Sequence, residues 1–103
     1  MMRTKTKRRP THPGELLREE TLPAAGLTPS ELAAHLGVSR RGINELLREH
    51  RAINPDLAHR LGRVFNTTPE FWLRLQEAVD IWDTWQTNRR EYDRLKPLNE
   101  RAA

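Results

Sequence analysis

The sequence predicts an all-α fold of five helices, with a helix-turn-helix at residues 28–48 and an extended helix near the C-terminus. Apolar side chains recur at intervals of three and four residues in separate stretches, which is the spacing of one face of an α-helix. Three stretches begin with a threonine or asparagine followed by proline, a combination typical of a helix start. A glycine at position 37 separates two helical stretches and predicts a tight turn there.

The N-terminal part divides into a basic tail and a first helix. Residues 1–11 hold five of the chain's 18 lysines and arginines and are predicted to be disordered. Two interpretations are open: a solvated tail, or an arm that lies along DNA phosphates or in a minor groove. We expect the first helix to run from His12 to about Leu22, where Pro23 would end it.

A helix, a turn and a second helix occupy residues 28–48. Thr28 begins a capping box with Glu31, which defines the start of the first helix of the motif. Gly37 can take the left-handed conformation that ends this helix, and Ser39 can cap the next one through its hydroxyl. The apolar positions shared by the two helices are Leu32, Ala33, Leu36, Ile43, Leu46 and Leu47.

The second helix of the motif opens with side chains suited to reading DNA. The first turn of a recognition helix faces the major groove, where an arginine fork can pair with guanine and an asparagine with adenine. We therefore predict that Arg40, Arg41 and Asn44 read bases. The alternative is an ordinary helical hairpin whose arginines form a solvated face. The predicted phosphate-binding residues, which would set the register on DNA, are Thr28, Ser39, Arg48 and Arg51.

Two further helices complete the predicted domain, which we place at residues 12–85. One begins at Asn54 and ends near Asn66. The other begins at Thr67 or Thr68 by the same threonine-proline device. The apolar stripe of this last helix comprises Phe71, Leu75, Ala78, Val79, Trp82 and Trp85.

This stripe is longer than a small helical core should need. Buried aromatic residues are common anchors of protein interfaces. We therefore predict that Val79, Trp82 and Trp85 form a dimer or partner contact; the alternative is that they complete the core of the same chain. Residues 86–103 are polar and predict a helical extension followed by a flexible C-terminus.

Composition and motifs argue against several classes of protein. A chain of 103 residues with 36% hydrophobic and 31% charged residues fits one domain. It has no run of 18 apolar residues for a membrane span, and its basic N-terminus lacks the apolar stretch of a secretory signal. The absence of cysteine excludes disulfides and thiolate metal sites and is consistent with the cytoplasm. The four histidines lack metal-binding spacing, and we find no phosphate loop or catalytic pair, so we expect no metal, no cofactor and no enzyme.

The net charge of +4 is unevenly distributed. The tail contributes five positive charges, and the rest of the chain has 13 basic against 14 acidic residues. A DNA-binding face must therefore be local, and arginines outnumber glutamates between residues 39 and 51. The first and last helices have acidic outer faces, which are poorly suited to DNA.

Two segments, HPGELLREE at 12–20 and TTPEFWLRLQ at 67–76, flank the helix-turn-helix. Together with LTPSELAAHLGVSRRGINELL at 27–47 they resemble the HigA-type antitoxin family, which has a Cro-type, XRE-like helix-turn-helix. The resemblance implies a Cro/lambda-repressor-like domain that dimerises and represses its own operon by binding a palindromic operator. It also implies that the chain neutralises a HigB-type toxin, a ribosome-dependent mRNA endonuclease. The implied DNA-reading positions are Ser39, Arg40, Arg41 and Asn44, and the implied core positions are Phe71, Trp72 and Leu75.

Two other functions fit the same residues. One is a stand-alone helix-turn-helix transcriptional regulator without a toxin partner. The other is a protein-interaction module whose reading helix no longer binds DNA. The acidic outer faces of the first and last helices favour the antitoxin, because an enzyme that cuts mRNA generally presents a positive cleft.

Overall fold

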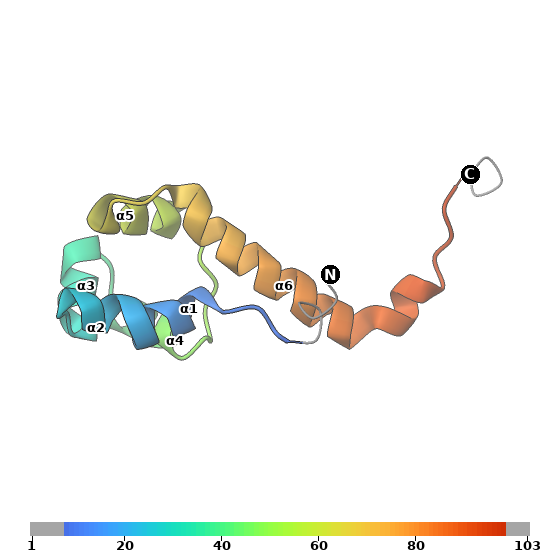
Figure 1. Ribbon diagram of the computed structural model, residues 1–103, viewed down its shortest axis with the longest axis horizontal. Coiled ribbons are helices and arrows are strands. Elements are labelled where there is room, and N and C mark those ends of the chain that lie inside the picture. Colours follow the sequence, from blue (N-terminus) through green and yellow to red (C-terminus); the bar gives the residue numbers. More distant parts are fainter. Residues whose placement is uncertain (1–7, 99–103) are drawn as a thin grey trace.

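The computed structural model describes residues 8–98, and every regular element in this part of the chain is helical (Figure 1). The predicted all-α fold is confirmed. The first three elements follow one another without a break, so residues 8–98 form five helical segments. The elements are α1 (Pro13–Leu16), η2 (Leu17–Thr21), α2 (Leu22–Ala25), α3 (Pro29–Leu36), α4 (Arg40–Leu47), α5 (Pro55–Phe65) and α6 (Pro69–Asp93).

The first helical segment continues through Pro23, so the expectation that this proline ends the helix is wrong. α1 passes into the π-helical turn η2, after which the N–H of Leu22 donates to the carbonyl of Leu17, five residues earlier. Proline lacks an N–H and crowds the carbonyl four residues earlier in a regular helix. The wider π turn changes this register, and Pro23 falls in the first turn of α2, where it is tolerated. The segment ends at Gly26, whose φ of 68° is left-handed.

Helix starts and ends are set by local hydrogen bonds, as predicted. The capping box of α3 is complete: Thr28 Oγ1 accepts the N–H of Glu31 at 3.1 Å, and Glu31 accepts the N–H of Thr28 at 2.9 Å. α3 ends at Gly37 with a φ of 70°, and α5 ends at Asn66 with a φ of 57°. The cap of α6 is Thr68, the second of the two threonines considered. The side chains that cap α1, α3, α4, α5 and α6 are His12, Thr28, Ser39, Asn54 and Thr68.

The core lies where the first helical segment, α3, α4 and α5 meet the beginning of α6. Leu17 and Leu61 are fully buried, and Trp72 is 2% exposed. The indole N–H of Trp72 donates to Thr67 Oγ1 at 2.8 Å, so the ring is buried with its polar atom satisfied. The apolar residues of the helix-turn-helix, all buried as predicted, are Leu32, Ala33, Leu36, Ile43, Leu46 and Leu47.

α6 gives the molecule its length, and the described chain measures 56 × 25 × 25 Å (Figure 1). The helix leaves the body and continues toward the C-terminus, crossing the predicted domain limit at residue 85. Its backbone departs from helical geometry at Asn88, where φ is −117° and ψ is 15°. Within residues 8–98, no helix combines the length and the apolar character needed to cross a membrane.

The apolar stripe of α6 is buried only in part. Trp72 and Val79 are covered, whereas Ala78 is exposed and Phe71 is 41% exposed. Phe71 packs edge-on against Trp72, with ring centroids 5.1 Å apart, but its outer side has no cover. The core role that the family resemblance implied for Phe71 is therefore wrong.

Candidate nucleic-acid interface

The turn between α3 and α4 is closed by a residue that the sequence analysis did not identify. Arg60, on α5, donates through Nη1 to the carbonyl of Leu36 at 2.8 Å and of Gly37 at 3.4 Å. These carbonyls belong to the end of α3, where no further helical N–H is available. Arg60 also pairs with Asp56 one turn earlier, at 2.9 Å. No local pattern links Arg60 to a carbonyl 24 residues away, so only the fold identifies this contact.

The predicted base-reading residues lie together on the outer face of α4. Arg40, Arg41 and Asn44 are all exposed, and the Arg41 side chain is 87% exposed. Ile43 and Leu46 on the opposite face are buried, so the helix is fixed while its polar side remains open. The hydroxyl of the cap, Ser39, accepts the N–H of Gly42 at 3.0 Å and defines the first turn. This arrangement can present an arginine fork and an amide to the edges of base pairs.

The four predicted phosphate-binding residues differ in what their side chains contact. Thr28 and Ser39 are exposed caps at the starts of α3 and α4, where backbone N–H groups and the helix dipole favour an anion. Arg48 is exposed, and none of the carboxylates in residues 8–98 pairs with it. Arg51, in contrast, is held by Glu45.

Glu45 bridges a predicted base reader and a predicted phosphate binder. Its Oε2 accepts from Nε of Arg41 at 3.2 Å, and its Oε1 accepts from Nη2 and Nε of Arg51 at 3.0 and 3.2 Å. Hydrogen bonds from Arg51 and then from Arg41 lower the pKa of Glu45, so the carboxylate stays ionised. The Arg41–Glu45 spacing of four residues was visible in the sequence as a helical ion pair, whereas the bond to Arg51 depends on the path of the following loop.

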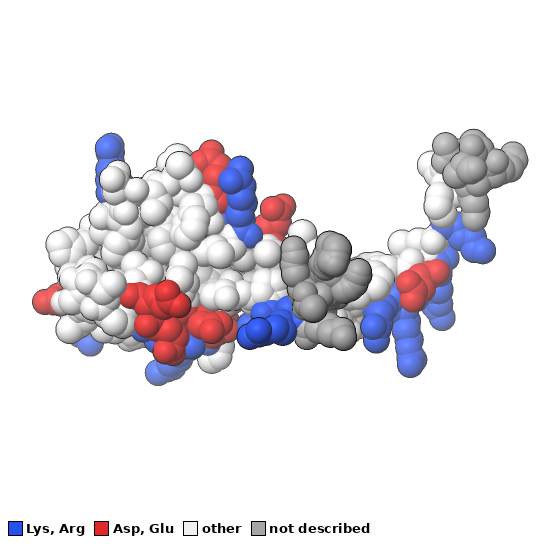
Figure 2. All heavy atoms as spheres, in the orientation of Figure 1, with Lys and Arg blue, Asp and Glu red and all other residues white. Residues whose placement is uncertain are grey.

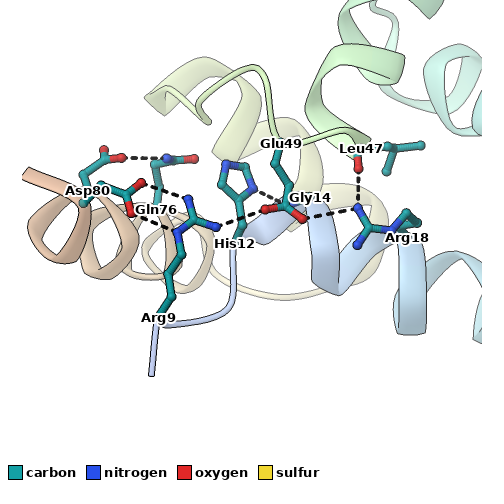
Figure 3. Close-up of polar contacts among 9 residues, drawn as sticks. Arg9, His12, Gly14, Arg18, Leu47, Glu49, Gln76 and Asp80 are labelled. Carbon is teal, nitrogen blue, oxygen red and sulfur yellow. Dashed lines mark hydrogen bonds and ion pairs between the residues drawn. The ribbon is translucent and has the colours of Figure 1, made fainter. Parts of the chain in front are cut away.

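The C-terminal end of α4 is held by ion pairs around Glu49 (Figure 3). Glu49 has a left-handed φ of 66°, an uncommon conformation for a residue with a side chain. Its carboxylate accepts from Arg9 at 3.1 Å and from Arg18 at 3.3 Å, and Arg18 also donates to the carbonyl of Leu47. Burial raises the pKa of Glu49, but the hydrogen bonds from Arg9 and Arg18 outweigh it and lower the pKa. These contacts fix α4 at the end opposite its predicted base-reading residues.

Arg9 also connects the N-terminal segment to α6. Its Nε and Nη2 donate to the two carboxylate oxygens of Asp83, both at 2.9 Å. The prediction of a disordered tail over residues 1–11 is therefore wrong for Arg9, because a forked ion pair holds it in place. Residues 1–7 lie outside the described part of the chain, so the two interpretations of the tail stay open.

His12 is a buried cap at the start of α1. It is 4% exposed, and its Nδ1 accepts the N–H of Gly14 at 2.9 Å (Figure 3). Burial lowers the pKa of His12; Arg9 adds to this effect, and the carboxylates of Glu49, Asp80 and Asp83 oppose it. Only the neutral imidazole can accept a hydrogen bond at Nδ1. The cap therefore requires the uncharged ring.

We expect the free energy of unfolding to fall as the pH drops below about 6.5, the ordinary pKa of histidine in an unfolded chain. In that range the unfolded chain binds a proton that the native His12 does not, so protonation favours unfolding. The stabilisation is complete above this pH and is lost toward the lower folded pKa, at no more than about 1.4 kcal/mol per pH unit. His12→Asn keeps a cap acceptor and removes the titration. The free energy of unfolding, measured with urea at several pH values in this range, should therefore fall less steeply with decreasing pH for His12→Asn than for the wild type.

The exposed histidine His59, on α5, offers a matched control. His59→Asn should keep the wild-type dependence of the unfolding free energy on pH between about pH 7 and pH 5, because it leaves the buried His12 cap in place. If His12→Asn and the wild type gave parallel curves, the cap would not depend on the neutral ring.

The three predicted interface residues have different environments. Val79 is 1% exposed, so the chain itself covers it, and its assignment to an intermolecular contact is wrong. Val79 lies one helical turn before Asp83, the residue of α6 that pairs with Arg9. Trp82 is half-buried, and Trp85 is 41% exposed and stacks on Tyr92 with centroids 5.9 Å apart. Trp82 and Trp85 keep surface available to a partner.

Charge is segregated over the surface. Figure 2 shows acidic side chains gathered over the α1–η2 region, whose first turns contain Glu15, Glu19 and Glu20. The predicted base-reading face of α4 carries Arg40 and Arg41. Within residues 8–98, no group of three or more histidine, cysteine or acidic side chains could hold a metal ion.

Comparison with known proteins gives a consistent picture. Residues 17–72 match the family model described as Helix-turn-helix (HTH_3), which is more than half of the chain. Antitoxin HigA-1 of Vibrio cholerae serotype O1 is 42% identical over 94 residues, covering 91% of this chain and 89% of that protein. YbaQ of Escherichia coli strain K12, described as an uncharacterized HTH-type transcriptional regulator, is 41% identical over 88 residues, covering 85% and 77%.

A solved structure agrees with the sequence matches. Pseudomonas aeruginosa antitoxin HigA, determined with the higBA promoter, superposes with a TM-score of 0.83 at 40% sequence identity. The superposition covers 87% of this chain and 99% of that chain. The shared fold therefore extends beyond the helix-turn-helix and into α6.

Proposed function

Because this chain belongs to the helix-turn-helix family and, within it, to the HigA-type antitoxins, we propose that it binds operator DNA, represses its own operon and neutralises a HigB-type toxin. It acts in the bacterial cytoplasm, where both operator and mRNA are found. It is a binding protein and not an enzyme.

The observation that carries the DNA-binding role is the exposed polar face of α4. Arg40, Arg41 and Asn44 occupy its first turns, and Ser39 and the buried leucines fix the direction in which they project. A helix placed in this way fits the major groove with its N-terminal residues toward the bases. The solved HigA relative with promoter DNA supports the assignment. The proposed base readers are Arg40, Arg41 and Asn44, and the proposed phosphate binders are Thr28, Ser39, Arg48 and Arg51.

The protein acts as a homodimer on a palindromic operator. Two-fold helix-turn-helix proteins place their recognition helices in successive major grooves about 34–36 Å apart. The exposed parts of Trp82 and Trp85 supply aromatic anchors for a second copy or for another partner. Val79 takes no part in this contact, because it is already covered.

The toxin is the second partner. An mRNA endonuclease needs a positive cleft, and the acidic first helical segment supplies complementary charge (Figure 2). Co-expression with a short basic protein encoded beside this gene tests the role. Restored growth and co-purification would support it, and continued growth arrest with no complex would contradict it.

Replacing Arg41 by alanine should relax sequence preference. One good bidentate pair contributes about 1–3 kcal/mol of discrimination, so the ratio of operator to shuffled-DNA affinity should fall by roughly 5- to 150-fold. Arg48→Ala should instead weaken binding to both duplexes alike and reduce the salt slope by about one. Fluorescence anisotropy with a duplex from the DNA upstream of the gene, at several salt concentrations, measures both quantities. Equal affinity of the wild type for upstream and shuffled DNA would overturn the repressor role.

A stand-alone regulator is the second candidate, and similarity to YbaQ is the observation that favours it. This candidate predicts the same DNA binding but no toxin. The neighbouring gene discriminates between the two: a short basic open reading frame beside this one supports the antitoxin, and its absence supports the regulator.

A further inference from the structure

We propose that Glu45 is a positioning residue for base recognition: it holds the guanidinium of Arg41 so that its two terminal nitrogens are free to fork onto a guanine. The inference rests on the proposed DNA-binding function and adds a residue to it. Glu45 lies one turn beyond Arg41 and beside Asn44, on the same side of α4 as the base readers. It would therefore set sequence discrimination without being a strong base contact itself.

The atoms used in the Arg41–Glu45 contact support this role. Glu45 Oε2 accepts from Nε of Arg41 at 3.2 Å, the nitrogen nearest the backbone. Within residues 8–98, no acceptor binds either terminal nitrogen of Arg41, and the side chain is 87% exposed. An arginine pairs with guanine O6 and N7 through a planar fork of N–H groups. Tethering Nε leaves two such groups available and reduces the rotamer freedom that binding would otherwise remove.

Arg51 offsets the electrostatic cost of placing a carboxylate at a DNA-binding face. It donates to Glu45 Oε1 from two nitrogens, at 3.0 and 3.2 Å. The guanidinium lies over the first turn of α4, because a Cβ added at Gly42 would meet Arg51 Cζ at 3.7 Å. Both carboxylate oxygens of Glu45 are thus occupied, and the three side chains together carry a net positive charge.

A simpler account is a surface ion pair that only stabilises α4, as helical pairs four residues apart commonly do. Such a pair would affect stability and leave sequence discrimination unchanged. A test must therefore measure discrimination and charge effects separately.

We suggest selecting duplexes from a random-sequence pool with the wild type, and then measuring each variant on the selected duplex and on its shuffled form. Glu45→Gln should bind shuffled DNA more tightly, because a negative charge is lost. The ratio of its affinity for the selected duplex to its affinity for the shuffled duplex should nevertheless fall by roughly five- to tenfold. Glu45→Asp keeps the charge but shortens the reach, and its ratio should fall as well. Repeating the selection with Glu45→Gln should weaken the same guanine preference that Arg41→Ala removes.

Glu20→Gln is the matched control, because it removes one exposed negative charge on η2, an element outside the helix-turn-helix. It should leave the ratio unchanged. Combining Arg41→Ala with Glu45→Gln should lower the ratio no further than Arg41→Ala alone, since Glu45 acts through Arg41.

Three outcomes would overturn the inference in distinguishable ways. An equal rise in affinity for both duplexes in Glu45→Gln would make Glu45 a simple repulsive charge. Additive losses in the double variant would make it an independent base contact. Failure of the wild type to enrich any sequence would instead reject the proposed DNA-reading function.

Discussion

Replacing Gly14 by alanine should destabilise the protein by about 3 kcal/mol, although alanine is the better helix former. A Cβ at Gly14 would collide with the carbonyl oxygen of Leu46 and lie 3.0 Å from its carbonyl carbon. Both atoms are backbone atoms of α4, so no side chain can move aside, and α1 must separate from α4 to accommodate the methyl group. The melting temperature should fall by more than about 10 °C, which calorimetry or thermal circular dichroism can measure.

Gly26→Ala is an informative control. Gly26 has a φ of 68°, and nothing lies within 4 Å of a Cβ added there. Gly26→Ala should lower the free energy of unfolding by about 1 kcal/mol, the cost of a left-handed conformation in a residue with a side chain. Stability of Gly14→Ala at or above the wild-type value would show that α1 and α4 are not in close contact, and the packing of α1 against α4 would need revision.

Replacing Gln76 by leucine should lower the free energy of unfolding by about 2 kcal/mol, because it leaves the buried backbone N–H of Ile53 without an acceptor. Gln76 is 6% exposed, its Oε1 accepts the N–H of Ile53 at 2.9 Å, and its Nε2 donates to Asp80 at 3.0 Å. The bond ties α6 to the loop that carries Arg51. Amide hydrogen exchange should therefore show lost protection at Ile53, in addition to the lower unfolding free energy in urea.

Gln86→Leu, on the exposed part of α6, makes the same chemical change without a buried partner. It should change stability by no more than about 0.5 kcal/mol. If the two variants were equally stable, the Ile53 amide would have another acceptor and the loop would not depend on α6.

The sequence predicted the helix limits well where the signal is local. The cap at Thr28 and the terminator at Gly37 act on backbone groups within a few residues, so their effect does not depend on the rest of the fold. The exposed first turn of α4 was predictable for the same reason, because Ser39 fixes where that turn begins. Pro23 was misjudged because a π turn upstream changes the register that proline would otherwise disrupt.

Partner choice among side chains was not predictable in this way. Arg9 pairs with Asp83 across 74 residues, and Gln76 binds the amide of Ile53 across 23. Periodicity identifies the apolar face of α6, but it does not say which part of that face the body covers. In the structure, Val79 is buried, whereas Phe71 on the same apolar stripe is partly exposed.

The sequence by itself determined an all-helical chain in which the predicted recognition helix begins at Arg40, because helix starts, ends and amphipathic faces are encoded within a few turns. Only the tertiary structure decided that Arg51 turns back onto Glu45 and that α1 rests on the backbone of α4 at Gly14. Such contacts depend on the directions in which separate helices cross, and those directions follow from packing the whole core at once.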